Sequence, residues 1–278
     1  KNGRTIYNGV LFVGELPLAE SPMKDHPLTP MRDSNLMRLM DAQSSGQVGL
    51  IPAPIVQQGA EAIRAKIAAL ITDGISYAVI DALDESDLRT IGKAAEDHTL
   101  ITGGSGIALG LPDNFRARGK ITLERNTTFA ATEGRALILA GSCSTATRAQ
   151  LAQAKAKWPH AKVDIDKVAA GDDVVIELTD WAKAQPADSP VIIYGSADPE
   201  EVAGIQKRYG VAVSGQMMED TLSALALRLA EAGFHRLVVA GGETSGAVVS
   251  ALNIKTLEIG PEIAPGVPWT QALDRPLT

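Results

Sequence analysis

The sequence predicts an α/β protein of two domains, each a mostly parallel sheet with flanking helices. Short apolar runs with the length and β-branched content of buried strands alternate with segments whose apolar residues fall at helical spacing. Such alternation is typical of parallel strands joined by crossover helices. The pattern stops once, over the basic stretch Pro112–Thr132, and then restarts. We therefore expect domains over residues 1–112 and 135–278, with a connection over 113–134.

Composition excludes several classes of protein. The chain has 278 residues with 45% apolar and only 4% aromatic side chains, enough for two cores of small residues. A net charge of −7 argues against a nucleic-acid surface. The single cysteine, Cys143, excludes an internal disulfide and fits a reducing cytoplasm. No apolar run is long enough for a membrane span. The first residues lack a Met and do not form a signal peptide, which suggests a fragment.

Each predicted domain is a series of strands and helices. In the first, the expected strands are Ile6–Val13, Val48–Ile51, Tyr77–Ile80 and Thr99–Thr102, and the expected helices are Leu36–Met40, Gly59–Thr72 and Glu85–Glu96. In the second, the expected strands are Ala136–Ala140, Val174–Leu178, Val191–Tyr194 and Leu237–Ala240, and the expected helices are Ala146–Lys157, Pro199–Tyr209, Gln216–Ala232 and Ala247–Leu252. We expect the proline-rich end, Ile259–Trp269, to be a rigid loop.

The glycine-rich segment Gly241–Gly246 follows one predicted strand and precedes a helix. The first N–H groups of a helix have no partner within it, and the macrodipole makes that end positive, so a phosphate fits there. A turn that only packs explains the same residues. Two similar turns, Gly103–Gly106 and Gly141–Thr145, also follow predicted strands, and this edge of an α/β sheet carries ligands. None of the three is a P-loop or a dinucleotide fingerprint.

Polar residues crowd the loop from His26 to Asn35. Together with Thr29, Arg32 and Asp33, these side chains could bind a polyol acid, with arginine on the carboxylate and Asp and Asn on hydroxyl groups. A capped helix entry with solvated charges is the alternative.

Three other features were weighed as sites. Asp81 ends a strand, where it would be either catalytic or a helix cap. Cys143 is expected to be a small buried residue rather than a nucleophile. The four histidines are scattered and predict no zinc site.

Six segments, in order, resemble the four-carbon acid sugar kinase family, and the resemblance extends over nearly the whole chain. They are His26–Asn35, Val79–Leu88, Gly103–Ala108, Leu139–Gln150, Val239–Leu252 and Ile259–Trp269. The resemblance implies an N-terminal sugar-acid domain, a C-terminal nucleotide domain, and transfer of a phosphoryl group from ATP, with Mg²⁺, to the terminal hydroxyl of a four-carbon sugar acid. The expected acceptor is 3-oxo-tetronate.

The resemblance also implies site residues. ATP would contact Ser142, Gly241, Gly242, Glu243, Thr244, Ser245 and Gly246. From the polar loop and the second glycine turn, we expect the sugar acid to contact His26, Arg32, Asp33, Asn35, Gly104 and Ser105. The catalytic base is left open between Asp33 and Asp81, and no metal is expected on the protein alone. The expected partner is a small sugar acid, not nucleic acid or a membrane, with a homodimer left open.

The chain departs from the family at both ends. The family's N-terminal Asp-Asp-x-Thr-Gly-Ala segment and its last glycine-containing segment are not in this sequence, so we expect these residues alone to be inactive. The alternatives are a non-catalytic α/β protein that binds nucleotide or sugar acid, or another enzyme such as a dehydrogenase or an aldolase.

Overall fold

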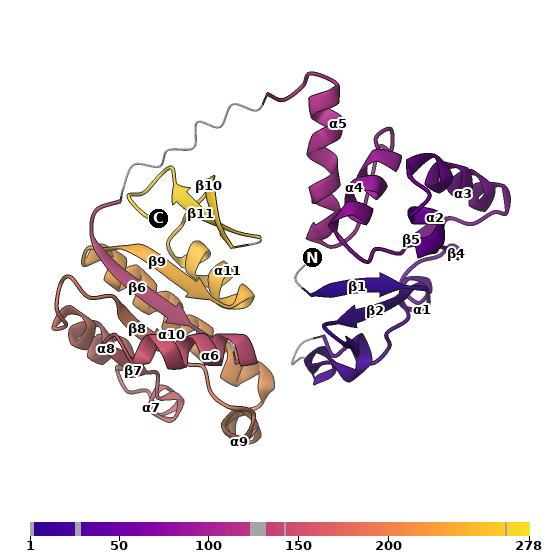
Figure 1. The fold of residues 1–278 in the computed structure, drawn as a ribbon. Coiled ribbons are helices and arrows are strands. Elements are labelled where there is room, and N and C mark those ends of the chain that lie inside the picture. Colours follow the sequence, from indigo (N-terminus) through magenta and orange to yellow (C-terminus); the bar gives the residue numbers. More distant parts are fainter. Residues whose placement is uncertain (1–2, 26–28, 123–131, 142, 265) are drawn as a thin grey trace. The chain divides into compact units, whose positions relative to one another are not determined.

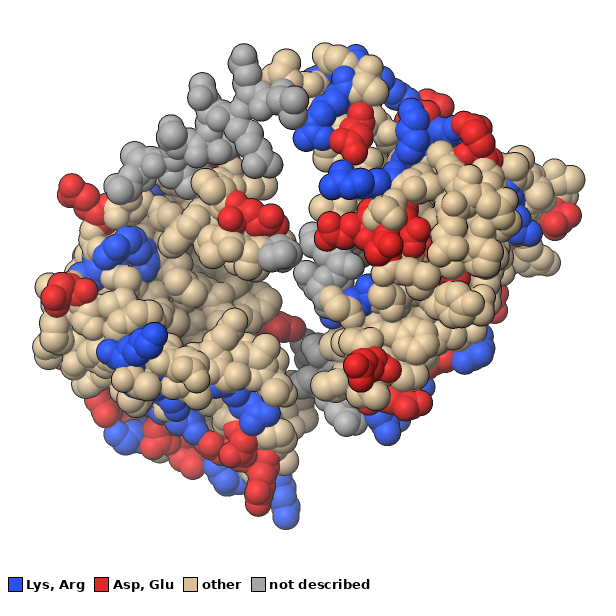
Figure 2. All heavy atoms as spheres, viewed as in Figure 1, with Lys and Arg blue, Asp and Glu red and all other residues tan. Residues whose placement is uncertain are grey.

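The fold is an α/β architecture in which helices flank parallel sheets, as the sequence predicts. The computed structural model describes residues 3–25, 29–122, 132–141, 143–264 and 266–278. The chain divides into two compact units, Lys1–Arg125 and Asn126–Thr278 (Figure 1). Acidic and basic side chains are interspersed over the face in view in Figure 2. None of the helices within the described ranges is long and apolar enough to cross a membrane.

The first unit contains a small antiparallel sheet and a parallel pair of strands. Its strands are β1 (Arg4–Tyr7), β2 (Val10–Val13) and β3 (Leu16–Pro17), in that spatial order, and the parallel pair β4 (Val48–Ile51) and β5 (Tyr77–Ile80). The single strand expected over Ile6–Val13 is wrong, because Asn8 and Gly9 both adopt positive φ and turn the chain back on itself. Asn-Gly is a strong signal for this hairpin turn.

The described part of the first unit also contains helices. They are α1 (Leu36–Asp41), α2 (Ala53–Val56), α3 (Ala60–Thr72), α4 (Glu85–Ala94) and α5 (Leu111–Ala117), with the short 3₁₀ segments η1 (Leu18–Glu20), η2 (Pro22–Asp25) and η3 (Ser105–Gly110). Their core contains Ile51, Ile63 and Ile91. The strand expected over Thr99–Thr102 is wrong, because Leu100 is 84% exposed and no strand covers it.

The start of the expected connection over residues 113–134 belongs to the first unit. Helix α5 occupies the stretch up to Ala117, and the boundary between the two units falls at Arg125/Asn126. The helix begins with Leu111-Pro112, and proline is well tolerated at the start of a helix.

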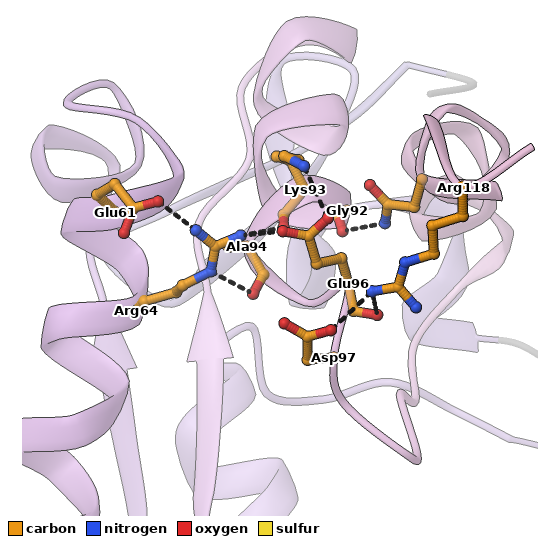
Figure 3. A network of polar contacts seen from close by, with 9 residues as sticks. Glu61, Arg64, Gly92, Lys93, Ala94, Glu96, Asp97 and Arg118 are labelled. Atoms are coloured by element: carbon orange, nitrogen blue, oxygen red, sulfur yellow. Dashed lines mark hydrogen bonds and ion pairs between the residues drawn. The ribbon is translucent and has the colours of Figure 1, made fainter. Parts of the chain in front are cut away.

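A polar network joins α3, α4 and α5 in the first unit (Figure 3). The guanidinium group of Arg64 on α3 donates to the carbonyls of Lys93 and Ala94, at the end of α4, at 2.8 and 3.3 Å. It also contacts Glu96 at 2.7 Å. Arg118, after α5, donates to the Glu96 carbonyl at 2.9 Å. Cationic side chains thus satisfy carbonyls at the negative end of α4.

The second unit is built on a four-stranded parallel sheet. Its strands are β6 (Arg135–Ala140), β7 (His160–Lys162), β8 (Val191–Tyr194) and β9 (Phe234–Ala240), in the spatial order β7-β8-β6-β9. Its helices are α6 (Thr145–Lys155), α7 (Ile165–Ala170), α8 (Val174–Lys183), α9 (Pro199–Tyr209), α10 (Val211–Glu231) and α11 (Gly242–Ala251). An antiparallel hairpin of β10 (Leu257–Ala264) and β11 (Val267–Ala272) follows.

Both faces of this sheet are covered by helices. Leu139 and Ile193 face a core that includes Leu225 of α10. Their neighbours Ala140 and Ile192 face Leu151 of α6 on the opposite side. Continuous apolar strands are expected where both faces of a sheet are buried.

Two expectations for the second unit are wrong. Val174–Leu178 is the start of α8 and not a strand: Val174 and Leu178 are buried while Ile176 is exposed, which is a helical period of four. The described residues of the expected loop Ile259–Trp269 lie in the β10–β11 hairpin, where Pro261 and Pro268 are tolerated in an irregular register.

Candidate functional site

Three turns meet at the carboxyl edge of the sheet in the second unit. Each connects a strand to a helix: β6 to α6, β8 to α9 and β9 to α11. The backbone N–H of Gly141 donates to the Ala240 carbonyl at 3.1 Å, and that of Gly195 donates to the Ala140 carbonyl at 2.9 Å. Backbone pairing therefore continues past the ends of the strands and holds the three turns side by side.

The N-terminus of α11 differs from those of the other two helices. Ser144 caps α6 by accepting from the N–H of Thr147 at 3.1 Å, and Asp198 caps α9 by accepting from the N–H of Glu201 at 2.9 Å. The N-cap of α11 is Gly241, which offers no side chain. Among the described residues, no side chain at the cap accepts from the first-turn N–H groups of α11, and an anion would supply an acceptor.

Helix α11 begins earlier than the sequence analysis expects. It starts at Gly242 and not at Ala247, so Glu243, Thr244 and Ser245 lie in its first turn. Gly246 belongs to the helix as well. The φ of +130° at Gly241 is a conformation that glycine adopts easily and that allows the chain to enter the helix directly from the strand.

The side chains of this turn divide into a buried and an exposed group. Thr244 is buried, and a Cβ added at Gly141 would overlap its hydroxyl oxygen, so the two turns pack without space for a larger residue. The Ser245 hydroxyl is turned back to the Val239 carbonyl, at 3.5 Å. Gly242 and Glu243 are exposed, and nothing lies within 4 Å of a Cβ added at Gly242. The open space therefore lies in front of Gly242.

Two other residues of this edge were singled out from the sequence. Ser142 lies outside the described residues. Cys143, expected to be buried, is exposed. It stands in the turn directly before the cap of α6, where no element covers it.

In the first unit, Asp33 and Asn35 form an ordered helix entry. Both oxygens of Asp33 accept from the Arg38 guanidinium, at 2.6 and 2.7 Å. This contact, with the N–H of Asn35, lowers the pKa of Asp33 from 3.8 to about 2. Asn35 caps α1 by accepting from the N–H of Arg38 at 3.0 Å.

The other residues expected to bind the sugar acid stand apart from this ion pair. Arg32 is exposed and forms no hydrogen bond or ion pair with the residues that the structure describes. Gly104 and Ser105 are exposed at the start of η3. His26 lies outside the described residues.

Asp81 is fully buried, and three backbone groups donate to it. They are the N–H groups of Asn8 at 2.7 Å, Gly9 at 2.9 Å and Ala53 at 2.9 Å. The carboxylate therefore joins the end of β5 to the β1–β2 turn and to the start of α2. Three donors to a fully buried carboxylate indicate a structural role.

The β1–β2 hairpin connects these parts of the first unit. On one side Ile6 pairs with Ala82, directly after Asp81, and on the other side Val10 pairs with Asn35. The Asp33–Asn35 segment is thus tied to the carboxyl edge of the β4–β5 pair. Gly104 and Ser105 lie on a separate element that packs against α4. Within the described parts of the chain, no group of three or more acidic, His or Cys side chains could hold a metal ion.

Known proteins match this chain over its whole length. A family model described as a nucleotide-binding C-terminal domain matches residues 137–278, and one described as a sugar-binding N-terminal domain matches residues 1–111. A protein of Brucella melitensis biotype 1 named 3-oxo-tetronate kinase is 44% identical over 100% of this chain. A Burkholderia multivorans protein of the same name is 46% identical over 99% of it. The chain spans 64% of the length of each of these relatives.

Solved structures agree with the fold. A crystal structure from Salmonella typhimurium LT2, whose description proposes a tRNA synthase, matches 99% of this chain and 66% of its own, with a TM-score of 0.81 and 40% identity. A Haemophilus influenzae structure matches the same shares with a TM-score of 0.67 and 39% identity.

Proposed function

We propose that the protein that contains this chain phosphorylates a four-carbon sugar acid. The chain belongs to the four-carbon acid sugar kinase family and matches its sugar-binding N-terminal and nucleotide-binding C-terminal domains. ATP is the proposed donor and 3-oxo-tetronate the proposed acceptor, phosphorylated at its terminal hydroxyl. The proposal assigns residues 1–112 to the sugar acid, residues 135–278 to the nucleotide and residues 113–134 to the connection. We place the reaction in a reducing cytoplasm, in keeping with the single, exposed cysteine.

The observation that carries the nucleotide part of the proposal is the uncapped N-terminus of α11. It stands at the carboxyl edge of a parallel sheet, beside two helices whose own side chains cap them. Phosphoryl transfer depends mainly on positioning the phosphates and neutralising their charge. The N–H groups of Gly242 and Glu243 would hold a phosphate, with Ser142 in the neighbouring turn as a further contact.

Mg²⁺ would arrive with the nucleotide and neutralise part of the phosphate charge. Glu243, exposed in the first turn of α11, would contact it through water. The packing of Thr244 against Gly141 would keep this turn in place beside the turn after β6.

The sugar-acid part of the proposal rests on the first unit. Arg32 presents an unpaired guanidinium among the described residues and would bind the carboxylate in a bidentate way. Asp33 and Asn35 are engaged in the entry to α1 and would position this loop, while Gly104 and Ser105 would contact the acceptor from η3. A non-catalytic binding protein is the rival, and it predicts ligand binding without turnover. A monomer and a homodimer both fit the proposal, and gel filtration decides between them.

The test of the nucleotide placement is Gly242→Val. Because the space at Gly242 is open, a valine side chain fits there and the fold should persist. The same side chain covers the N–H groups at the N-terminus of α11, so ATP affinity should fall about tenfold or more. Calorimetry measures the affinity, and circular dichroism checks the fold. Ser250→Val, which places the same side chain at the far end of α11, should leave the affinity unchanged. Wild-type ATP affinity in Gly242→Val would overturn the placement.

A further inference from the structure

A pocket lies at the carboxyl edge of the sheet in the second unit, on the face covered by α6. Its volume is about 230 Å³. One wall is a single face of α6 formed by Arg148, Leu151 and Lys155, at spacings of three and four residues. The opposite wall contains Tyr194 at the end of β8 and the buried Ser196 after it.

Arg148 differs from Arg135, whose Nε is also buried without a hydrogen-bond partner but whose other guanidinium nitrogens donate to the carbonyls of Lys183 and Gln185. The Nε of Arg148 is buried and has no hydrogen-bond partner, and its guanidinium forms no ion pair with any residue that the structure describes. Most buried polar atoms in proteins are satisfied. Arg148 lines the pocket, and its guanidinium charge has no partner among the described residues, so an anion from outside the chain would supply one.

Lys155 adds a second positive charge to the pocket. Its ammonium group lies 3.3 Å from the Tyr194 hydroxyl and 4.5 Å from the centre of that ring, and it forms no ion pair with a described carboxylate. The two acidic residues of the lining are already engaged. Glu201 pairs with Lys162, and Asp198 caps α9. Asp198 keeps its negative charge at that cap, so the lining holds three cationic and two anionic side chains and carries a net positive charge.

The size of the pocket limits its ligand. Sites for small organic ligands usually measure roughly 300–1,000 Å³, so about 230 Å³ suits a small anion or one end of a larger molecule. The N–H donors of a guanidinium group and an ammonium group can bind the oxygens of one phosphate together. We propose that Arg148 and Lys155 form a phosphate-binding site in this pocket, additional to the N-terminus of α11.

The phosphate group has two possible sources with the same chemistry. It belongs either to the phosphate chain of a nucleotide that extends from the neighbouring turns, or to a separate phosphorylated compound. The inference requires only the pocket, and it stands or falls independently of ATP binding at α11.

The experiment titrates the 278-residue chain with inorganic phosphate in a calorimeter, without and with saturating ADP. Arg148→Gln and Lys155→Gln each remove one charge and keep a good helix former. Arg228→Gln removes the same charge from an exposed position of α10 and serves as the matched control. Circular dichroism verifies that all three variants fold.

We expect wild type and Arg228→Gln to bind phosphate equally, and Arg148→Gln to bind it about tenfold more weakly or worse. Competition between ADP and phosphate would identify the nucleotide as the source, and phosphate binding in the presence of ADP would identify a separate compound. Both results support the site. Absence of phosphate binding to wild type, or equal affinity in Arg148→Gln, Lys155→Gln and the control, would overturn the proposal.

Discussion

At the scale of single residues, we infer from its contacts that Asp81 joins elements of the first unit rather than acting as the catalytic base. Its carboxylate is fully buried and accepts from three backbone N–H groups that belong to two different elements. A base must reach the proton of a bound substrate, whereas this carboxylate is fully buried and already accepts from three N–H groups, out of roughly four acceptor sites. The sequence shows that Asp81 ends a strand, but the donors at Asn8 and Gly9 are more than seventy positions away.

We predict that Asp81→Asn destabilises the protein by about 2–3 kcal/mol, because the amide replaces a charged acceptor with a donor that faces three N–H groups. Urea unfolding measures the change. Asp73→Asn, at an exposed position after α3, should alter stability by less than about 0.5 kcal/mol. Wild-type stability together with lost phosphoryl transfer in Asp81→Asn would instead identify Asp81 as the base.

Asp33 gives a prediction about pH. The Arg38 guanidinium lowers its pKa from 3.8 to about 2, so the folded state holds the ionised form more strongly than the unfolded state does. The pair therefore stabilises the fold above the ordinary pKa, and this contribution is lost as the pH falls through about 2. Asp33 is therefore ionised at every pH well above about 2. If Asp33 is the catalytic base, its protonation cannot cause a loss of phosphoryl-transfer rate near neutral pH.

Carboxyl NMR checks this prediction. The Asp33 signal should stay that of the ionised form at pH 3.5, where an unperturbed aspartate with a pKa of about 3.9 is largely protonated. In Arg38→Gln the signal should titrate at higher pH. Protonation of Asp33 in the wild type at pH 3.5 would contradict the proposed ion pair.

At the scale of elements, glycine contacts set the position of η3 and hence of Gly104 and Ser105. Helix α4 and η3 cross so closely that a Cβ added at Gly92 would lie 2.5 Å from the carbonyl of Gly110. Asn114 of α5 reinforces the crossing by donating to the Gly92 carbonyl at 2.7 Å. The segment that contains Gly104 and Ser105 is therefore held by close backbone contact between Gly92 and Gly110, together with the packing of Ile107 against the core.

Gly92→Ala should destabilise the protein by about 1–3 kcal/mol, because the added methyl group forces the two backbones apart. Gly204→Ala in α9, where an added Cβ would make only an ordinary contact with the Arg208 side chain at 3.8 Å, should instead be neutral or stabilising by up to about 1 kcal/mol. Thermal unfolding compares the two variants. Equal melting temperatures would show that η3 does not pack as described.

Elements with a clear period or a cap were predictable from the sequence, and those decided by distant contacts were not. The strands Val48–Ile51 and Val191–Tyr194 and the helix Pro199–Tyr209 are confirmed with the expected limits. Val174–Leu178 has a strand-like composition, but burial at every fourth residue places it in a helix. The pairing that makes β10 a strand is contributed by β11, which local composition does not reveal.

In the candidate site, too, some features follow from the local sequence and others depend on the folded structure. The strand, glycine turn and helix of Gly241–Gly246 were visible in the sequence, whereas the earlier start of α11 depends on the positive φ of Gly241. Arg148 and Lys155 had a weak signal, two cations on one face of a predicted helix. Only the turn after β8 shows that they line a pocket.

At the scale of the whole molecule, two units with different ligand chemistry belong to one chain. The first matches a family model described as sugar-binding and the second one described as nucleotide-binding, and the proposed kinase reaction needs both ligands. The chain spans 64% of the length of its Brucella melitensis relative, so activity is best measured on the gene product that carries it.

The most direct test of the account is phosphorus NMR of that gene product with ATP, Mg²⁺ and a panel of four-carbon sugar acids. We expect the products to be ADP and 3-oxo-tetronate phosphorylated at its terminal carbon. In the Arg32→Lys variant, the KM for 3-oxo-tetronate should rise about tenfold, while the KM for ATP should stay unchanged. Arg89→Lys, an exposed position on α4, is the control and should leave both constants unchanged. ATP binding without a phosphorylated product from any acid of the panel would contradict the assignment as a kinase.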